Sequence, residues 1–412
     1  MMRGRLFSLA RAVAARVGVV VRRVWVVVRA RLRVATTLGW SLVAVAVLAL
    51  VVGGAFGWGE LAALGLGAVL VVASAIPFVL IRPVYDVAIE LAAHRVRVGE
   101  RAVGRLVVRG AGRRTSPATT VRLPVGAARP EFRMPRLAPG QEYDELFTVP
   151  TVRRAILTLG PVTSVRTDPV GALRREVAWT EPELLYIHPR VVVIDSETTG
   201  ILRDLEGLPT RDLADDDMSF HALREYSAGD DLRHVHWVST ARTQTLMIRQ
   251  FEQTRRSHLL VVLSTDLDDY ADEDEFELAV STVGSVGLSA LRGGKTLTVL
   301  THEGTLALHG ERTFMDALSG IEARPSGTGI ARAARAIATA APGASVVVFV
   351  TGAAGALADL RAASLRAPIT ARSVAVRATR HEQPARRVLG DLVFADVAEL
   401  EQLPAALRAV SE

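Results

Sequence analysis

The first strong feature of the chain is a pair of uncharged apolar runs near its start. The runs cover residues 38–56 and 61–81, and only a short turn segment separates them. Each run has about the 20 apolar residues that a helix needs to cross a bilayer. Trp40 and Trp58 stand near the ends of the runs, where indole rings favour the membrane–water interface. The pattern predicts a hairpin of two transmembrane helices within residues 36–82.

A different pattern, with a period of two residues, begins directly after the runs. In residues 85–91 the large apolar side chains stand at every second position, which is the period of a half-buried strand. Further short apolar segments follow, separated by Gly, Pro and Ser, and none of them has a helical period. Short strands at this spacing predict a small β-sandwich over residues 83–180.

Continuous apolar runs replace this alternation from residue 258 onward. The runs at 258–264, 296–301 and 345–350 are typical of buried parallel strands. A further strand is predicted at 372–378, and helices are predicted near 273–292, 311–319, 328–340, 353–362 and 396–409. Alternating strands and helices predict a doubly wound α/β domain over residues 258–412. Residues 181–257, between the two folded parts, are rich in charge and poor in periodicity.

Charge is distributed unevenly and decides the expected orientation. The chain of 412 residues has a net charge of +6, but residues 1–35 contain nine Arg and no acid, so the remainder carries a small net negative charge. A basic arm of this kind should stay in the cytoplasm, and two spans return the chain to the same side. We therefore expect a two-pass protein of the inner (plasma) membrane with both termini cytoplasmic. The arm can also lie along anionic lipid.

Two alternatives to this membrane interpretation fit the same residues less well. A secretory signal peptide has a short basic region and a small-residue cleavage site, whereas here the arm is long and a second apolar run follows. Two charge-free runs in tandem are also unusual for the core helices of a soluble protein. The basic body of a nucleic-acid-binding protein is not expected, because the excess positive charge belongs to the arm. The absence of Cys excludes disulfides, a thiol nucleophile and Cys-based metal sites.

The densest cluster of polar and aromatic residues lies within the segment 217–252. Arg and carboxylate side chains alternate there, and Asp230 or Asp231 is placed to cap a short helix. Because Arg forms bidentate pairs with carboxylates, an ion-pair network is expected. The network has two alternative roles: it ties the segment to the α/β sheet, or it forms a surface that binds a partner. The candidate residues are Arg224, Glu225, Tyr226, Gly229, Asp230, Asp231, Arg233, His236, Trp237, Ala241 and Arg242.

These residues resemble the hallmark of a bacterial family, the domain of unknown function 58, also called the MoxR-associated, von Willebrand factor A-like family. The match rests on Leu-Arg-Glu-Tyr at 223–226, Gly-Asp-Asp at 229–231, His-Trp at 236–237 and Ser-Thr-Ala-Arg at 239–242. Upstream, Gly-Pro at 160–161, Asp-Pro-Val-Gly at 168–171 and residues 185–190 are similar to further family elements. Val170 and Val238 depart from the usual Phe and Lys.

The resemblance implies a membrane-anchored cytoplasmic scaffold or adaptor rather than an enzyme. Family members are thought to serve MoxR-type AAA ATPases and stand beside transglutaminase-like membrane proteins, so these are the expected partners, together with the lipid bilayer. Envelope assembly or stress handling is the expected process. The alternatives are a metal-dependent hydrolase that uses the acidic edge of the α/β domain, and a structural membrane protein that assembles with itself.

The resemblance also implies a metal site, which this sequence has lost in part. A von Willebrand A domain holds Mg²⁺ with an Asp-x-Ser-x-Ser motif, a Thr and a further Asp, all of them hard oxygen ligands. Here the motif begins with Ser264 instead of Asp, and Thr351 is followed by Gly352 instead of Asp. Asp266 and Asp268 are the weak candidates that remain, at the start of an acidic run that also suits the N-terminus of the following helix. We expect no bound metal and no cofactor.

Other catalytic motifs are missing from the sequence. There is no phosphate-binding loop of the Gly-x-x-x-x-Gly-Lys type, no Gly-x-Ser-x-Gly and no His-Glu-x-x-His. His221, His234 and His236 would form a three-His site only if they lay on one face of a strand. The sequence therefore predicts that the protein is not an enzyme.

Overall fold

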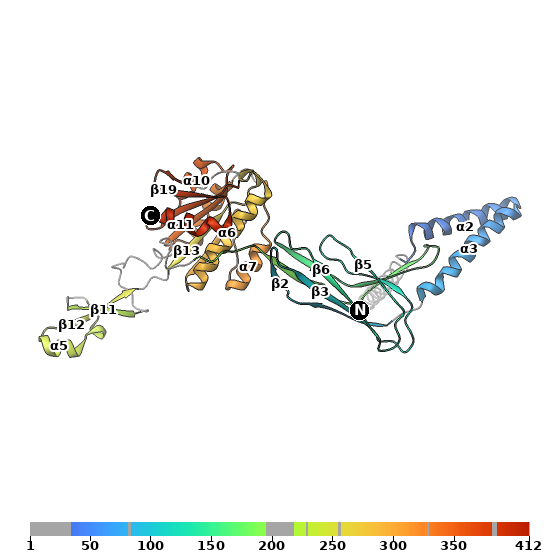
Figure 1. The fold of residues 1–412 in the computed structure, drawn as a ribbon, viewed down its shortest axis with the longest axis horizontal. Coiled ribbons are helices and arrows are strands. Elements are labelled where there is room, and N and C mark those ends of the chain that lie inside the picture. The colour runs from blue at the N-terminus through green and yellow to red at the C-terminus, as the bar shows by residue number, and fades with distance from the viewer. Residues whose placement is uncertain are drawn as a thin grey trace, which may run out of the picture. The chain divides into compact units, whose positions relative to one another are not determined.

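The computed structural model describes residues 34–80, 84–194, 218–227, 230–253, 257–325, 327, 329–380 and 385–411. Of the expected basic arm, only Val34 and Ala35 fall within this part of the chain. The chain divides into two compact units, and Figure 1 shows their elements. The first unit comprises Met1–His94, Arg101–Pro150 and Leu157–Leu185, and the second comprises Arg95–Glu100, Thr151–Ile156 and Tyr186–Glu412.

Two long apolar helices open the first unit, α2 (Thr37–Phe56) and α3 (Gly59–Leu80). Both are long and apolar enough to cross a membrane, judged by length and composition. Thr36 caps α2 by accepting a hydrogen bond from the Gly39 amide at 3.1 Å. The helices contact each other through small residues, since a Cβ at Gly53 would lie only 2.7 Å from the Ala62 nitrogen.

Two antiparallel sheets with a common core make up the rest of this unit. One has the order β1-β3-β6 and the other β5-β4-β8-β9. Leu106 and Val108 of the first sheet share one hydrophobic cluster with Val121 and Met134 of the second. The strands are β1 (Tyr85–Leu91), β3 (Ala102–Gly110), β6 (Glu142–Val149), β5 (Glu131–Met134), β4 (Thr119–Arg122), β8 (Thr163–Thr167) and β9 (Arg174–Ala178).

The second unit is built on a mixed seven-stranded sheet with the order β15-β14-β13-β16-β17-β19-β18. The five inner strands are parallel, and the edge strands β15 and β18 are antiparallel to their neighbours. The strands are β13 (His258–Leu263), β14 (Thr296–Thr301), β15 (Gly304–Thr305), β16 (Val346–Gly352), β17 (Arg372–Ala378), β18 (Arg386–Leu389) and β19 (Leu392–Val397).

Helices cover both faces of this sheet, because successive side chains of a buried strand point to opposite sides. Val261 belongs to the core beneath α6, α7 and α11, whereas Val262 belongs to the core beneath α8, α9 and α10. These helices are α6 (Glu273–Arg292), α7 (Glu311–Ser319), α8 (Gly329–Ala334), α9 (Ile337–Ala340), α10 (Leu357–Ser364) and α11 (Leu403–Ser411).

The C-terminal part of the sheet differs from the sequence prediction. A helix was expected near 396–409, but residues 386–397 form the hairpin β18–β19, and α11 begins only at Leu403 after the short helix η4 (Leu400–Gln402). Gly390, with φ of 63°, makes the tight turn of this hairpin. The predicted helix at 328–340 is also split into α8 and α9.

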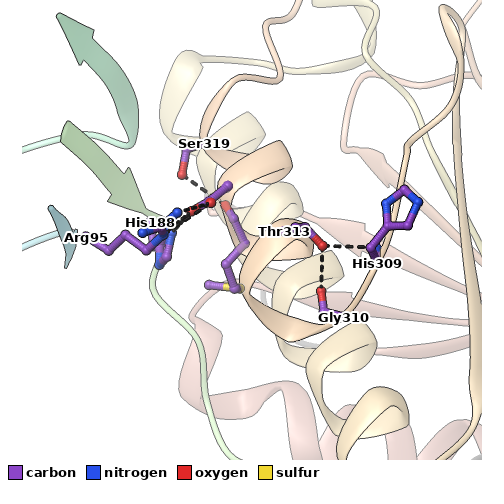
Figure 2. A network of polar contacts seen from close by, with 8 residues as sticks. Arg95, His188, His309, Gly310, Thr313 and Ser319 are labelled. Atoms are coloured by element: carbon purple, nitrogen blue, oxygen red, sulfur yellow. Dashed lines mark hydrogen bonds and ion pairs between the residues drawn. The ribbon is translucent and has the colours of Figure 1, made fainter. Parts of the chain in front are cut away.

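A small sheet with the order β2-β10-β7 completes the β-structure, with β2 (Arg95–Arg97), β10 (Glu183–His188) and β7 (Ala155–Leu159). Within the second unit, Arg95 of β2 binds Asp316 of α7 through two guanidinium nitrogens, Nε at 2.9 Å and Nη2 at 2.8 Å. His188 Nε2 lies 2.8 Å from the same carboxylate. Figure 2 shows the side chains of Arg95 and His188 side by side in this network. Burial alone would raise the pKa of Asp316, but its hydrogen bonds to Arg95 and His188 outweigh burial and lower it.

Candidate functional site

The family-like segment is carried by an antiparallel hairpin of β11 (Met218–Glu225) and β12 (Met247–Gln253). The chain between these strands forms two short helices, η2 (Leu232–His234) and α5 (Trp237–Thr243). Backbone hydrogen bonds fold this connection back onto the hairpin: the Tyr226 amide donates to Leu246 and the His236 amide donates to Met247. Val235 and Ile248 are buried beneath it. Of the predicted residues, Gly229 lies outside the described part of the chain.

Arg224 and Asp230 form a bidentate pair at the start of the connection. Arg224 Nη1 donates to Asp230 Oδ2 at 2.7 Å, and Nη2 donates to Oδ1 at 2.6 Å. Asp230 Oδ2 also accepts a hydrogen bond from the Ser227 amide at 2.8 Å. The hydrogen bond to Arg224 is the main cause that lowers the pKa of Asp230. The pair therefore closes the turn that follows Glu225 and keeps the carboxylate ionised.

Asp231 caps a short helix, which is one of the two assignments that the sequence predicted. It caps η2 by accepting a hydrogen bond from the Arg233 amide at 2.9 Å. The Arg233 guanidinium lies 2.8 Å from the same carboxylate, and this contact lowers the pKa of Asp231. The Arg233 side chain is 87% exposed, so the ion pair is solvated and contributes little stability.

His236 fixes the start of α5 rather than contributing to a three-His site. Its Nδ1 accepts a hydrogen bond from the Ser239 amide at 3.3 Å and lies 2.8 Å from Ser239 Oγ. His234 belongs to η2, so the two side chains do not lie on one face of a strand as a shared metal site would need. His221 is in β11, and its side chain is outside the described part of the structure.

The described ion pairs of this segment join its residues to one another and do not lead to the α/β sheet. Two pairs of the expected network are described, Arg224–Asp230 and Arg233–Asp231. Arg242 and Ala241 are exposed on α5. Large apolar side chains are exposed beside them: Trp237 is 68% exposed, Val238 64% and Leu232 60%. We call these three residues the apolar cluster of the segment.

The second candidate site lies where β13 and β16 end side by side. In a doubly wound sheet this position is the topological switch point, where ligands commonly bind. Ser264 follows β13, and Thr351 lies at the end of β16. Both side chains are buried.

A carboxylate of the same unit accepts hydrogen bonds from both hydroxyls. Asp269, in the short helix η3 (Leu267–Asp269), accepts a short hydrogen bond from Ser264 Oγ and a second one from Thr351 Oγ1 at 3.4 Å, both at its Oδ2. Burial raises the pKa of Asp269, and the nearby charge of Asp266 adds to the shift. Asp269 has no distinguishing signal in the sequence, because its position in space depends on the path of the chain after β13.

Asp266 and Asp268, the weak metal candidates, face different surroundings. Asp266 is buried and accepts hydrogen bonds from the Gly329 amide at 3.0 Å and from the Asp268 amide at 3.3 Å. Asp268 is exposed. Among the residues that the structure describes, no group of three or more His, Asp and Glu side chains is arranged to hold a metal ion.

Gly352, which stands where a metal-binding form would have Asp, is tightly enclosed. A Cβ at this position would overlap the Asp269 carbonyl oxygen and lie 2.5 Å from Tyr270 Cδ1. Tyr270 is itself fixed, because its hydroxyl donates to the Ser264 carbonyl at 2.5 Å. An Asp side chain at position 352 would therefore have no space, because the chain around η3 occupies it.

A buried Arg is a further feature that the sequence analysis did not find. Arg154 Nη1 donates to the Leu318 carbonyl at 2.9 Å and to the Ile321 carbonyl, so it binds the C-terminal end of α7. Its Nε lies 3.1 Å from a carboxylate oxygen of Glu277 on α6. Burial lowers the pKa of Arg154 and raises that of Glu277. A single Arg in an Arg-rich chain gives no sequence signal for such a role.

The geometry thus defines a mixed α/β sheet whose switch-point hydroxyls bind Asp269, and a hairpin that carries two Arg–Asp pairs and an exposed apolar cluster. Residues 222–403 match the model of the family described as "Protein of unknown function DUF58". The match begins in β11 and ends at the start of α11. It confirms the resemblance drawn from the residues of 223–242.

Comparison with curated proteins gives no match. The β-rich middle region has similar solved structures, among them the CARDB domain of a Pyrococcus furiosus protein, with 17% identity, coverage of 26% of this chain and 93% of that chain, and a TM-score of 0.20. The sporulation control protein Spo0M of Bacillus subtilis is also similar, with 14% identity, coverage of 35% and 58%, and a TM-score of 0.17. Similarities at these TM-scores carry no inference about function.

Proposed function

We propose that this protein is a scaffold of the inner membrane, whose cytoplasmic body docks a MoxR-type AAA ATPase through the segment 224–242. A transglutaminase-like membrane protein is proposed as a second partner, and envelope assembly or stress handling as the process. The proposal assigns the chain no catalytic step. The observation that carries it is the apolar cluster of Leu232, Trp237 and Val238, which stays exposed on a segment in which Arg224 binds Asp230 and Arg233 binds Asp231.

The membrane part of the proposal is supported by the side chains of the two apolar helices. On α2, Leu48 is 65% exposed and Val51 is 62% exposed, whereas Ala46, Ala49 and Gly53 are buried against the neighbouring helix. A soluble helix pair would place its large apolar side chains inside and its small ones outside. The observed arrangement suits helices whose outer surface meets lipid.

The second unit is proposed to be a von Willebrand A-like domain. Counted along the chain from β13, its first five sheet positions have the order 3-2-1-4-5, which is the doubly wound order. The switch point lies between β13 and β16, where such a domain would hold its cation. In this chain we propose that Asp269 replaces the cation as the partner of Ser264 and Thr351, so that the domain serves as a framework.

The apolar cluster has the character of an interaction surface. Trp is enriched among the few residues that carry most of the binding energy of protein interfaces, and energetically near-neutral neighbours exclude water around such residues. Here Trp237 opens a helix that His236 caps, and the Arg224–Asp230 pair closes the preceding turn. The charged residues of the family motif therefore hold the segment in shape, and the apolar residues would contact the partner.

The proposal is tested by affinity capture of the tagged full-length protein from native membranes, with and without ATP, followed by mass spectrometry. We expect an AAA ATPase in the wild-type eluate, in an amount that depends on nucleotide, and its loss with Trp237→Ala. Ile369→Ala is the matched control, because Ile369 is fully exposed on the same unit but outside the segment. Equal recovery of the ATPase with both variants, or no ATPase with the wild type, would overturn the docking role.

A further inference from the structure

Beyond the docking role, an open pocket in the first unit is lined mainly by charged side chains from three strands and by the residues that precede α2. Its volume is about 590 Å³, and Arg122, Arg129, Glu131, Arg174, Glu176 and Thr36 contribute to its walls. We propose that this pocket binds the phosphate of an anionic phospholipid at the cytoplasmic surface of the membrane. The inference rests on the membrane anchoring proposed above and is independent of the docking role.

The level of the pocket relative to the bilayer follows from the ends of the two apolar helices. Thr36, the last residue before α2, donates its hydroxyl to the Gly171 carbonyl at 2.7 Å, and its amide donates to the Ala172 carbonyl at 3.0 Å. At the other helix, Arg175 Nη1 donates to the Val79 carbonyl at 3.1 Å, near the end of α3. The segment 171–175 therefore holds both helix ends, and it fixes where the apolar spans stop.

A lipid whose chains run beside α2 would place its phosphate next to this segment. The headgroup region on each side of a bilayer is roughly 5–8 Å thick, so it begins where the apolar spans end. Thr36 stands at this boundary and also lines the pocket. Basic pockets at the cytoplasmic ends of spans are suited to anionic headgroups.

The charges of the pocket leave one positive charge for a ligand. Arg122 Nε donates to Glu131 at 3.0 Å, and Arg174 Nη2 donates to Glu176 at 2.6 Å, so two of the three guanidinium groups have carboxylate partners. Arg129 is exposed and makes no hydrogen bond or ion pair with any described residue. A phosphodiester, with its single negative charge, would balance this excess.

The pocket also contains an unused donor. Arg174 Nε is shielded from solvent and has no hydrogen-bond partner among the residues that the structure describes. A buried donor without a partner is unfavourable, and Arg174 would gain one if its guanidinium turned toward a bound phosphate. Arg129 and Arg174 are therefore the residues that we expect to contact the phosphate, while Arg122 holds the two glutamates in place.

The binding test uses the full-length protein in detergent, titrated with phosphatidylglycerol and followed by native mass spectrometry. Arg129→Gln is the main variant, because it breaks no ion pair of the described structure. Arg101→Gln is its matched control: it removes the same charge from an exposed site of the same unit outside the pocket. We expect about fivefold weaker phosphatidylglycerol binding for Arg129→Gln and wild-type binding for Arg101→Gln. A double variant, Arg122→Gln with Arg174→Gln, should lose the bound lipid.

Three further measurements separate the possible sources of failure. Identical titrations for Arg129→Gln and Arg101→Gln would overturn the assignment of this pocket as the lipid site. Equal binding of phosphatidylcholine would overturn its preference for an anionic lipid. Displacement of the lipid by soluble glycerol phosphate at equal concentration would show that the ligand is a soluble phosphate and not a lipid. Carbonate extraction of cell membranes tests the anchor separately. If the wild-type protein is extracted, the membrane anchoring itself is wrong; if it stays while the titrations coincide, only the lipid pocket is wrong.

Discussion

The segment 224–242 and the carboxyl ends of β13 and β16 contain similar polar groups but leave different surfaces exposed. In the segment, Arg224 binds Asp230 while Trp237 remains 68% exposed. At the strand ends, Ser264 and Thr351 donate to Asp269, and both hydroxyl side chains are buried. In both regions several polar side chains of the motif bind partners within their own unit. Only the segment leaves a large apolar surface in contact with solvent.

This difference separates the paired charges of the family motif from the apolar side chains of the same segment, which stay exposed. Buried polar groups need partners, so a folded chain first uses its carboxylates and guanidinium groups to satisfy itself. Exposed aromatic side chains have no such internal use and gain free energy when a partner covers them. The functional prediction therefore moves from the Arg and Asp residues to the apolar cluster beside them.

The largest effect should come from placing a carboxylate where a metal-binding form would carry it. Gly352→Asp puts a Cβ against the Asp269 carbonyl oxygen and 2.5 Å from Tyr270 Cδ1, in a site that is already buried. We expect a loss of roughly 3 kcal/mol or more of stability, since the variant combines overpacking with a buried charge. Thermal unfolding of the full-length protein measures it. Gly343→Asp is the control, because a Cβ at Gly343 meets nothing within 4 Å.

The same variant also tests whether the switch point can regain a cation. If Gly352→Asp melts near the wild type and Mg²⁺ then raises its melting temperature, the site is open rather than self-filled, and the contrast between the two regions disappears. A bound ion would stabilise the folded state by mass action. We expect no such recovery.

A smaller effect is expected from neutralising the carboxylate that fills the switch point. Burial raises the pKa of Asp269 in the folded protein, so the folded state holds its proton to higher pH than the unfolded state, whose value is about 3.9. The contribution of Asp269 to stability therefore falls as the pH rises from about 4 through the folded pKa. Asp269→Asn lacks this titration, and its stability relative to the wild type should increase over that interval.

Asp316 provides a comparison in which stability should change with pH in the opposite direction. Its pKa is lowered in the folded protein, so its contribution is present above the usual value and is lost as the pH falls. Denaturant unfolding of Asp269→Asn, Asp316→Asn and the wild type from about pH 2 to pH 7 measures both slopes, that of Asp316 below about pH 4 and that of Asp269 above it. Parallel curves for Asp269→Asn and the wild type would mean that Asp269 is not the buried partner of the two hydroxyls.

A still smaller and purely local effect is expected in the segment. Asp230→Ala removes the acceptor of both Arg224 nitrogens and of the Ser227 amide, so the turn after Glu225 should open. Hydrogen exchange at Ser227 should accelerate, with little change in the global melting temperature. Arg233→Gln is the comparison, since Arg233 is 87% exposed and its pair with Asp231 should be dispensable. Equal exchange in both variants would show that the Arg224–Asp230 pair does not hold the turn.

Periodicity predicted those parts of the fold in which the pattern is long. The apolar run at 258–264 and the helix at 273–292 appear as β13 and α6, because a buried strand and a long amphipathic helix each repeat their pattern over many residues. The hairpin β18–β19 was missed, since Leu392 and Phe394 alternate over too few residues to exclude a helix. The partners within the candidate sites were not predictable either, because the turns at 226–231 and 264–269 decide which carboxylate meets which donor.

The smallest effect on stability should come from the residue on which the docking proposal depends most. Trp237 begins α5 and is 68% exposed, so Trp237→Ala removes little buried apolar area and should change stability by no more than about 0.5 kcal/mol. Ile369→Ala, at a fully exposed site, should behave alike. Matched melting curves, together with loss of ATPase capture for Trp237→Ala alone, would separate binding from folding. A clear drop in the melting temperature of Trp237→Ala would instead show that the indole packs inside the protein, and the segment would then resemble the strand ends, with no surface left for a partner.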